Sequence, residues 1–156
     1  MAPRTLDAII AAHPFFAGLG ADVCRMIAGC GRNVRFDAGV RIYRQGDPAD
    51  VFYLIRYGRV ALEMAGGGTP LVYETLGDGD ILNASWLVPP HVCRSDARAL
   101  VLTRAIALDA VCLRGKCDAD HHLGYELMMR FVPVVVERLA NARLQAMDLY
   151  GSGAAR

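Results

Sequence analysis

Residues 36–63 read FDAGVRIYRQGDPADVFYLIRYGRVALE and form the most informative stretch of the chain. Short runs of β-branched and aromatic residues alternate here with turns centred on Gly39, Gly46 and Gly58. Turn residues at intervals of roughly 8–12 positions are typical of short antiparallel strands, because each strand must reverse before the next one begins. The stretch therefore predicts consecutive short strands joined by tight turns.

The same alternation of short β-branched and aromatic runs with turn residues continues on both sides of this stretch, from Asn33 as far as Asp109. The later runs include PLVYETLGDGD at 70–80 and DARALVLTRAIALD at 96–109, and both end on turn residues. Together they indicate about seven or eight strands, which suit a jelly roll or small barrel better than βαβ units. The predicted fold class is therefore mostly β with flanking α: an antiparallel β jelly roll, or double-stranded β-helix.

Helical patterns flank the strands. Thr5 can cap a first helix that ends before Pro14, and a second helix is expected over residues 21–28. From Ala110 onward the pattern is helical again, although Pro133 should cost about 3 kcal/mol unless it marks a kink or a helix start. We expect one domain, made of N-terminal helices at 1–32, the jelly roll at 33–109 and C-terminal helices at 110–150, followed by a flexible tail at 151–156.

The last predicted helix carries apolar residues at alternating spacings of four and three, a heptad-like seam. The seam residues are Met128, Val132, Val135, Leu139, Ala142, Ala146 and Leu149. A second apolar face is formed by Val136, Leu144 and Met147. A helix with two apolar faces must bury one on its own domain. We expect the seam from Met128 to Leu149 to form a homodimer interface or to bind a protein partner that the sequence does not identify.

This layout resembles the cyclic nucleotide-binding domain: a helical lead-in, an eight-stranded jelly roll and a long C-terminal helix. HPFFAGL at 13–19 is similar to the family's entry motif, and residues 36–63 match its strand–turn core almost position for position. In that core Tyr53 and Ile55 are expected to face inward. The resemblance covers roughly residues 10–150 and implies a regulatory protein that binds cyclic AMP, cyclic GMP or another small anionic ligand.

The stretch GDILNASWLVPPHVCRSDARAL at 79–100 stands where the family has its phosphate-binding cassette. There a Gly-Glu pair opens a short helix, and an Arg followed by Ser or Thr begins the next strand. Helix amides and the guanidinium hold the cyclic phosphate, while the Glu carboxylate accepts from the ribose hydroxyl. Here the Gly-Glu pair falls on Asn83 and Ala84, so the ribose-binding carboxylate is absent.

The cassette arginine has two alignments. Counting forward from the cassette opening puts the Arg-Ser pair on Arg94 and Ser95, whereas counting back from ARAL at 97–100 puts Cys93 at the arginine position. Strand alternation favours the second count, because Cys93 and Ser95 then face inward and Arg94 faces outward. A bulge would return Arg94 to the pocket.

The candidate ligand-binding residues are Asn83, Ala84, Ser85, Trp86, Cys93, Arg94 and Ser95. Trp86 is the only tryptophan and could stack on a base, but we favour a core anchor. Asn83 and Ser85 are candidates both for capping the short helix and for donating to an anion, and these two roles compete.

Other chemistries fit the sequence less well, and we expect neither an enzyme nor a metal site. The four histidines do not form the closely spaced pair that a cupin requires, and the group Cys112, Cys117, His121 and His122 matches no standard zinc site. The cysteines are not clustered as an iron–sulfur centre needs. Cys93 has no histidine partner except His91, two residues away, which argues against a catalytic thiol.

Charge and hydropathy argue against a DNA-binding protein and against a membrane protein. The net charge is +1 without a clustered basic face, and only six residues follow Tyr150, where relatives of the catabolite-activator type carry a helix-turn-helix. We therefore expect no direct DNA binding. No apolar run approaches the roughly 18 residues of a membrane helix and no signal peptide is evident, so we expect a cytoplasmic protein with its five cysteines reduced and mostly buried.

Three functions stay open. The chain senses a ligand other than an ordinary cyclic mononucleotide, or binds such a nucleotide weakly; it binds cyclic AMP or GMP conventionally; or it is an interaction scaffold with an empty cassette. For the first two, the resemblance implies a hinge through which the occupied cassette repositions the C-terminal helix.

Overall fold

The computed structural model describes residues 4–65 and 67–154, with side chains as far as residue 148. Its strands are β1 (Gly31–Phe36), β2 (Arg41–Tyr43), β3 (Val51–Tyr57), β4 (Val60–Met64), β5 (Leu71–Leu76), β6 (Ile81–Leu82), β7 (Asp96–Ala99) and β8 (Thr103–Asp109). They form two four-stranded sheets, in the orders β1-β8-β3-β6 and β2-β7-β4-β5, with antiparallel pairing. The predicted jelly roll is confirmed.

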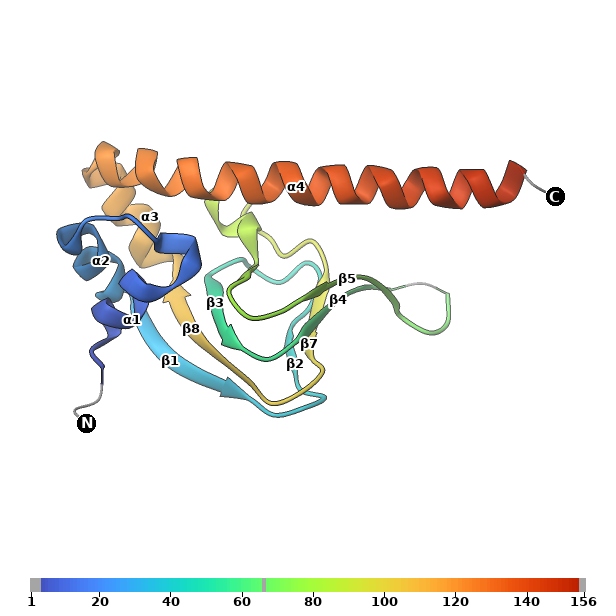
Figure 1. The fold of residues 1–156 in the computed structure, drawn as a ribbon, viewed down its shortest axis with the longest axis horizontal. Coiled ribbons are helices and arrows are strands. Elements are labelled where there is room, and N and C mark those ends of the chain that lie inside the picture. The colour runs from blue at the N-terminus through green and yellow to red at the C-terminus, as the bar shows by residue number, and fades with distance from the viewer. Residues whose placement is uncertain (1–3, 66, 155–156) are drawn as a thin grey trace.

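Within the described residues, six helical segments accompany the roll. They are α1 (Leu6–Ala12), η1 (Pro14–Phe16), α2 (Ala21–Ala28), η2 (Ala84–Leu87), α3 (Ala110–Ala119) and α4 (His121–Ala154), where η marks a 3-10 helix. Figure 1 shows α1, α2 and α3 at one end of the roll, while α4 runs along one side and past β5. The bounds predicted for the second helix agree with those of α2.

The glycine turns predicted in the central stretch are present. Gly39, Gly46 and Gly58 have φ angles of 86°, 89° and 128°, which side-chain-bearing residues rarely adopt. Gly58 is constrained twice, because a Cβ added there would lie 2.4 Å from the hydroxyl oxygen of Thr103. This turn therefore requires glycine both for its conformation and for its close approach to β8.

Alternation along β3 divides the interior into two apolar clusters. Phe52 and Leu54 face the helices and pack in the larger cluster, which also contains Phe131 of α4. Tyr53 and Ile55 face the inside of the roll, as the sequence predicts. Because β3 contributes to both clusters, it positions the roll relative to the helices.

His13 links the N-terminal segment to the same strand. Its Nε2 donates to the carbonyl of Ile55 at 3.1 Å, and its Nδ1 accepts from the amide of Phe15 at 3.2 Å. Burial lowers the pKa of this imidazole, although the bond to the Ile55 carbonyl opposes that shift. His13 is therefore a structural, neutral histidine rather than an exposed one.

DARALVLTRAIALD forms the last two strands, β7 and β8, separated by residues 100–102. One expectation about element bounds needs correction. Helix α4 continues through Pro133 and as far as Ala154, so most of the predicted tail is helical. Pro133 leaves the carbonyl four residues earlier, that of Met129, without its helical hydrogen bond. Met129 is exposed, so water can satisfy that carbonyl.

The expectation of five reduced cysteines is also wrong, because Cys30 and Cys112 form a disulfide with Cα atoms 5.9 Å apart. The antiparallel register of β1 and β8 pairs Gly31 with Leu108, which brings the end of α2 beside the start of α3. Two cysteines separated by 82 positions thereby become neighbours. The free cysteines are Cys24, Cys93 and Cys117.

Candidate ligand-binding site

The cassette stretch runs from β6 through Asn83 into η2 and returns by a loop to β7. Asn83 has a φ of 77°, in the left-handed region that asparagine tolerates better than most residues. It stands at the N-cap position of η2, but its side chain does not cap the helix. Instead, Nδ2 donates to the Val51 carbonyl at 2.9 Å and to the Cys93 Sγ at 3.5 Å. The predicted capping role of Asn83 is therefore wrong, and its amide holds the cassette against β3.

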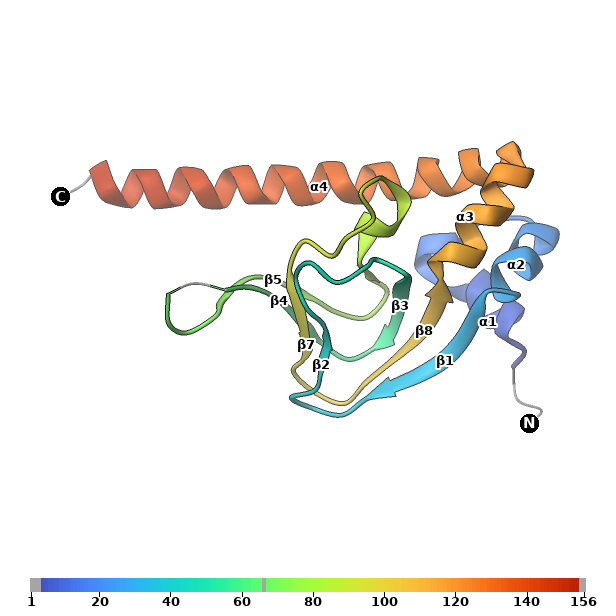
Figure 2. The same ribbon diagram turned by 180° about the vertical axis from the view of Figure 1, so that it is seen from behind.

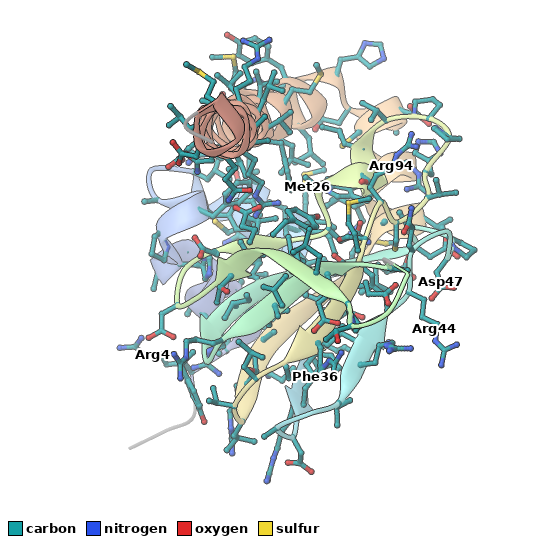
Figure 3. The ribbon with its side chains drawn as sticks, turned by 90° about the vertical axis from the view of Figure 1, so that its right-hand side faces the viewer. Arg4, Met26, Phe36, Arg44, Asp47 and Arg94 are labelled. Carbon is teal, nitrogen blue, oxygen red and sulfur yellow. A yellow bond between two sulfur atoms is a disulfide. The ribbon has the colours of Figure 1, made fainter. Side chains whose placement is uncertain are left out.

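Cys93 and Arg94 point in opposite directions. Cys93 is 2% exposed and Ser95 is also buried, whereas Arg94 is exposed. Figure 3 shows Arg94 on the cassette loop at the side of the molecule where Arg44 and Asp47 also lie. The alignment counted back from ARAL therefore gives the observed orientation, with Cys93 at the inward position.

Backbone bonds fix Cys93 there. Its amide donates to the Asp47 carbonyl and its own carbonyl accepts from the Gly46 amide, both at 2.8 Å. Burial raises the pKa of the Cys93 thiol to about 11, and the nearby carboxylate of Asp47 adds to that effect. The inward position consequently holds a neutral thiol at physiological pH.

Trp86 is a core anchor, as favoured from the sequence. It is fully buried and stacks on Phe52 with ring centroids 4.4 Å apart and planes 9° apart. Its ring also meets the edge of Phe131 of α4 at 5.3 Å. Figure 2 shows the short helix η2 lying directly against α4. The indole Nε1–H finds no hydrogen-bond partner among the described residues.

The other cassette residues make fewer contacts. Ala84 and Ser85, both in η2, are half-buried. Ala84 packs against the larger apolar cluster. A methyl group thus stands where the family's carboxylate would be.

Two arginines that the sequence did not single out hold the cassette in place. Arg114 of α3 donates to the Trp86 carbonyl at 2.6 Å and to the Ala49 carbonyl at 3.4 Å. Arg138 of α4 donates to the carbonyl of Ile81 in β6, near the start of the cassette stretch. No spacing motif marks either residue, because both act on backbone carbonyls that only the fold brings near.

Arg138 also pairs with Glu74 of β5, with Nε and Oε1 3.7 Å apart. Both side chains are largely buried, at 21% and 23% exposed. Burial raises the pKa of Glu74, an effect that the Arg138 guanidinium partly offsets. The pair therefore bridges the roll and α4 at a site partly shielded from water.

Two hollows adjoin this pair. The larger, of about 630 Å³, lies between the β4–β5 hairpin and α4. The smaller, of about 210 Å³, lies beside Phe15 and the segment 79–81. Glu74, Thr75, Arg138 and Asn141 line both of them, and none of the predicted ligand-binding residues lines either. Both hollows thus lie on the α4 side of the roll rather than at η2.

The predicted seam of α4 is exposed. Met128, Val132, Val135 and Leu139 are each 48–51% exposed. Ala142 and Ala146 are also exposed, and the side chain of Leu149 lies outside the described residues. The second apolar face of Val136, Leu144 and Met147 is exposed as well. A third face, formed by Leu123, Leu127 and Phe131, packs on the domain, so neither predicted face does.

Within residues 4–65 and 67–154, no three side chains of His, Cys, Asp or Glu gather in a way that could hold a metal ion. Over the same residues, no helix is long and apolar enough to cross a membrane.

Comparison with known proteins agrees on one family. The model of the cyclic nucleotide-binding domain matches residues 33–120. No curated protein sequence matches the chain. Among solved structures, a protein from Geobacter metallireducens described as cyclic nucleotide-binding is 26% identical, with a TM-score of 0.76 over 84% of this chain and 96% of that one.

Two further structures share the fold. A cyclic nucleotide-binding domain from Methylobacillus flagellatus is 15% identical, with a TM-score of 0.76 over 92% of this chain and 82% of that one. A cAMP-binding acyltransferase from Mycobacterium smegmatis is 26% identical, with a TM-score of 0.68 over 86% of this chain and 40% of that one.

Proposed function

Because the chain belongs to the cyclic nucleotide-binding domain family, we propose that it is a non-enzymatic regulatory module that senses a small ligand without the standard cyclic nucleotide clamp. This proposal is supported mainly by Cys93 and Ala84, which occupy the inward positions where the family's arginine and glutamate would stand. Arg94 is the one arginine of segment 79–95, and it faces outward.

A cyclic phosphate seated in the cassette would meet a neutral thiol instead of a guanidinium. Hydrogen bonds to a charged group contribute about 1.5–3 kcal/mol each, so losing one to the phosphate and one to the ribose weakens binding by about 3 kcal/mol or more. That corresponds to roughly a hundredfold in the dissociation constant. The Asn83 amide does not replace the clamp, because it already donates to Val51 and Cys93.

The favoured ligand position is the hollow between β5 and α4. Its volume of about 630 Å³ lies within the usual range of small-molecule sites. Arg138 offers a largely buried cation there, and a ligand carboxylate or phosphate could take the place of Glu74 beside it. We therefore propose a small anion as the ligand, with cyclic AMP and cyclic GMP as weak members of that class.

Helix α4 is the proposed output. Arg138 connects it to Ile81, and Phe131 connects it to Trp86 of the cassette. Pro133 lies between these two contacts, where the helix lacks one backbone bond and bends most easily. A ligand that removes Arg138 from Ile81 would therefore alter how α4 lies on the roll.

The exposed seam from Met128 to Ala146 is the proposed receiving surface, with a second copy of this chain as its partner. Its spacing of four and three suits a two-stranded coiled coil. The seam is apolar rather than basic, which favours a protein partner over DNA.

A catalytic role for Cys93 is not part of this proposal. Its Sγ contacts the Asn83 amide and the Pro48 carbonyl rather than a base, and its raised pKa disfavours the nucleophilic thiolate.

Calorimetry and thermal shift with cyclic AMP and cyclic GMP test the proposal, combined with native mass spectrometry of the purified protein for a bound small molecule. We expect dissociation constants above about 100 μM for both nucleotides, and a retained or added anion whose binding is lost in Arg138→Met but kept in Arg94→Ala. Micromolar cyclic AMP binding that disappears in Arg94→Ala would establish conventional binding instead. No ligand response at all, with a dimer that depends on Leu139, would identify a scaffold.

A further inference from the structure

The Cys30–Cys112 disulfide joins two elements that the chain places far apart. Cys30 lies between α2 and β1, and Cys112 lies in the first turn of α3. We propose that this pair is a site of thiol–disulfide exchange, at which a low-molecular-weight thiol reversibly breaks the covalent link between α3 and the N-terminal helices. The proposal does not depend on which ligand the roll binds.

The disulfide can be reached from the surface. A hollow of about 470 Å³ is lined by both cysteines together with Asp50, Asp109 and Arg32. Its volume is in the range of small-molecule sites, so a small thiol has room to approach. Cys112 is partly buried while Cys30 is only 8% exposed, so Cys112 is the more accessible of the two to an incoming sulfur. Attack therefore occurs at the Cys112 Sγ, with Cys30 as the leaving group.

Reduction of the disulfide consumes two thiols of the donor. A donor thiolate attacks the Cys112 Sγ, the Cys30–Cys112 bond breaks, and Cys30 leaves as a thiolate that takes a proton from water. A second donor thiolate then attacks the donor sulfur of the mixed disulfide and releases the Cys112 thiolate, which is also protonated. Two electrons pass from the two donor thiolates to the pair, the two released thiolates take protons from water, and the donor becomes its own disulfide. The oxidised donor drives the reverse reaction.

Noncovalent contacts would keep α3 in place after the disulfide is broken. Lys116 of α3 donates to the carbonyl of Met26 in α2 at 2.6 Å, and the Asp109 amide donates to the Cys30 carbonyl at 2.8 Å. Leu113 is fully buried, and Arg114 still holds Trp86. Reduction therefore loosens α3 without detaching it.

Greater mobility of α3 would be transmitted to α4, because the two helices are consecutive. Only Asp120 separates α3 from α4, and its carboxylate accepts from the first amides of α4. With the disulfide intact, α2, β1 and α3 are covalently tied. Once it is reduced, only noncovalent contacts join α3 to α2. The redox state of the pair consequently sets how freely α3 and the base of α4 move.

Counting thiols on the full chain tests whether the bond forms. After incubation with oxidised glutathione, unfolding and alkylation, mass spectrometry should find three labelled cysteines, and five after dithiothreitol. In Cys30→Ser, which removes the leaving cysteine, oxidised glutathione should instead add one glutathione at Cys112. Five labelled cysteines in the oxidised sample, or no adduct at Cys112, would overturn the proposal.

Hydrogen exchange and melting on the folded protein test what the bond does. Reduction should lower the melting temperature by on the order of 10 °C and speed amide exchange in residues 110–119. A Cys30→Ser, Cys112→Ser double variant should already show fast exchange and should not respond to reductant, whereas Cys117→Ser should respond as the unmodified chain does. Equal exchange in α3 with and without reductant would refute the loosening of α3.

Discussion

Replacing Trp86 tests how the cassette is anchored. The side chain is fully buried between Phe52 and Phe131, so Trp86→Ala should destabilise the protein by about 3–5 kcal/mol, the usual cost of truncating a large buried aromatic residue. Trp86→Phe should behave differently. It retains a ring over Phe52 and removes an N–H without a described partner, whose burial costs about 1–3 kcal/mol. That gain offsets much of the lost packing, so we expect a change within about 1.5 kcal/mol.

Urea unfolding followed by far-ultraviolet circular dichroism measures both free energies of unfolding, because replacing the only tryptophan removes the fluorescence signal. Leu87→Ala, a half-buried neighbour in η2, is the matched control and should cost about 1 kcal/mol. If Trp86→Ala costs no more than this control, Trp86 is not an anchor. If Trp86→Phe is as unstable as Trp86→Ala, the unpaired N–H is not a burden on the fold.

Three other predictions concern pH, the proline and the seam. Folding holds His13 neutral, so the unfolded chain binds more protons below the ordinary histidine pKa of about 6.5, and the free energy of unfolding should fall as pH drops below that value. Urea midpoints at pH 8 and pH 5.5 should therefore differ less in His13→Gln than in the unmodified chain or in the exposed control His122→Gln; an unchanged pH dependence in His13→Gln would contradict this. Pro133→Ala should restore a helical hydrogen bond and raise the free energy of unfolding by about 1–3 kcal/mol in the same assay, and any loss of stability would oppose the idea. Leu139→Asp should convert dimer to monomer in sedimentation experiments while Ala140→Asp leaves it intact; a dimer that survives Leu139→Asp would exclude the seam.

The roll was predictable because its signals are local. The turns at Gly39, Gly46 and Gly58 have positive φ angles that favour glycine, and alternation along β3 sorts its side chains between two faces. The same rule places Cys93 inward and Arg94 outward, since the alternation of Ala97 and Ala99 continues back along the chain.

The missed features depend on distant parts of the chain. The Cys30–Cys112 pair exists because β1 and β8 are adjacent, which no local pattern reveals. The contact of Arg138 with Ile81 requires α4 to lie across the roll. The seam spacing on α4 was recognisable, but the packed face around Phe131 is equally apolar. Helical periodicity alone therefore could not decide which face is buried.

The length of α4 has a mechanical consequence. At about 1.5 Å per residue, the 34-residue helix is about 51 Å long, and about 32 Å of it follows Pro133. Figure 1 shows this distal part continuing past β5. A tilt of about 5° at the proline would displace the far end by about 3 Å, by the same rise per residue. A small change in the direction of α4 near Ile81 would therefore be amplified along the helix and would displace its C-terminal end by several ångströms.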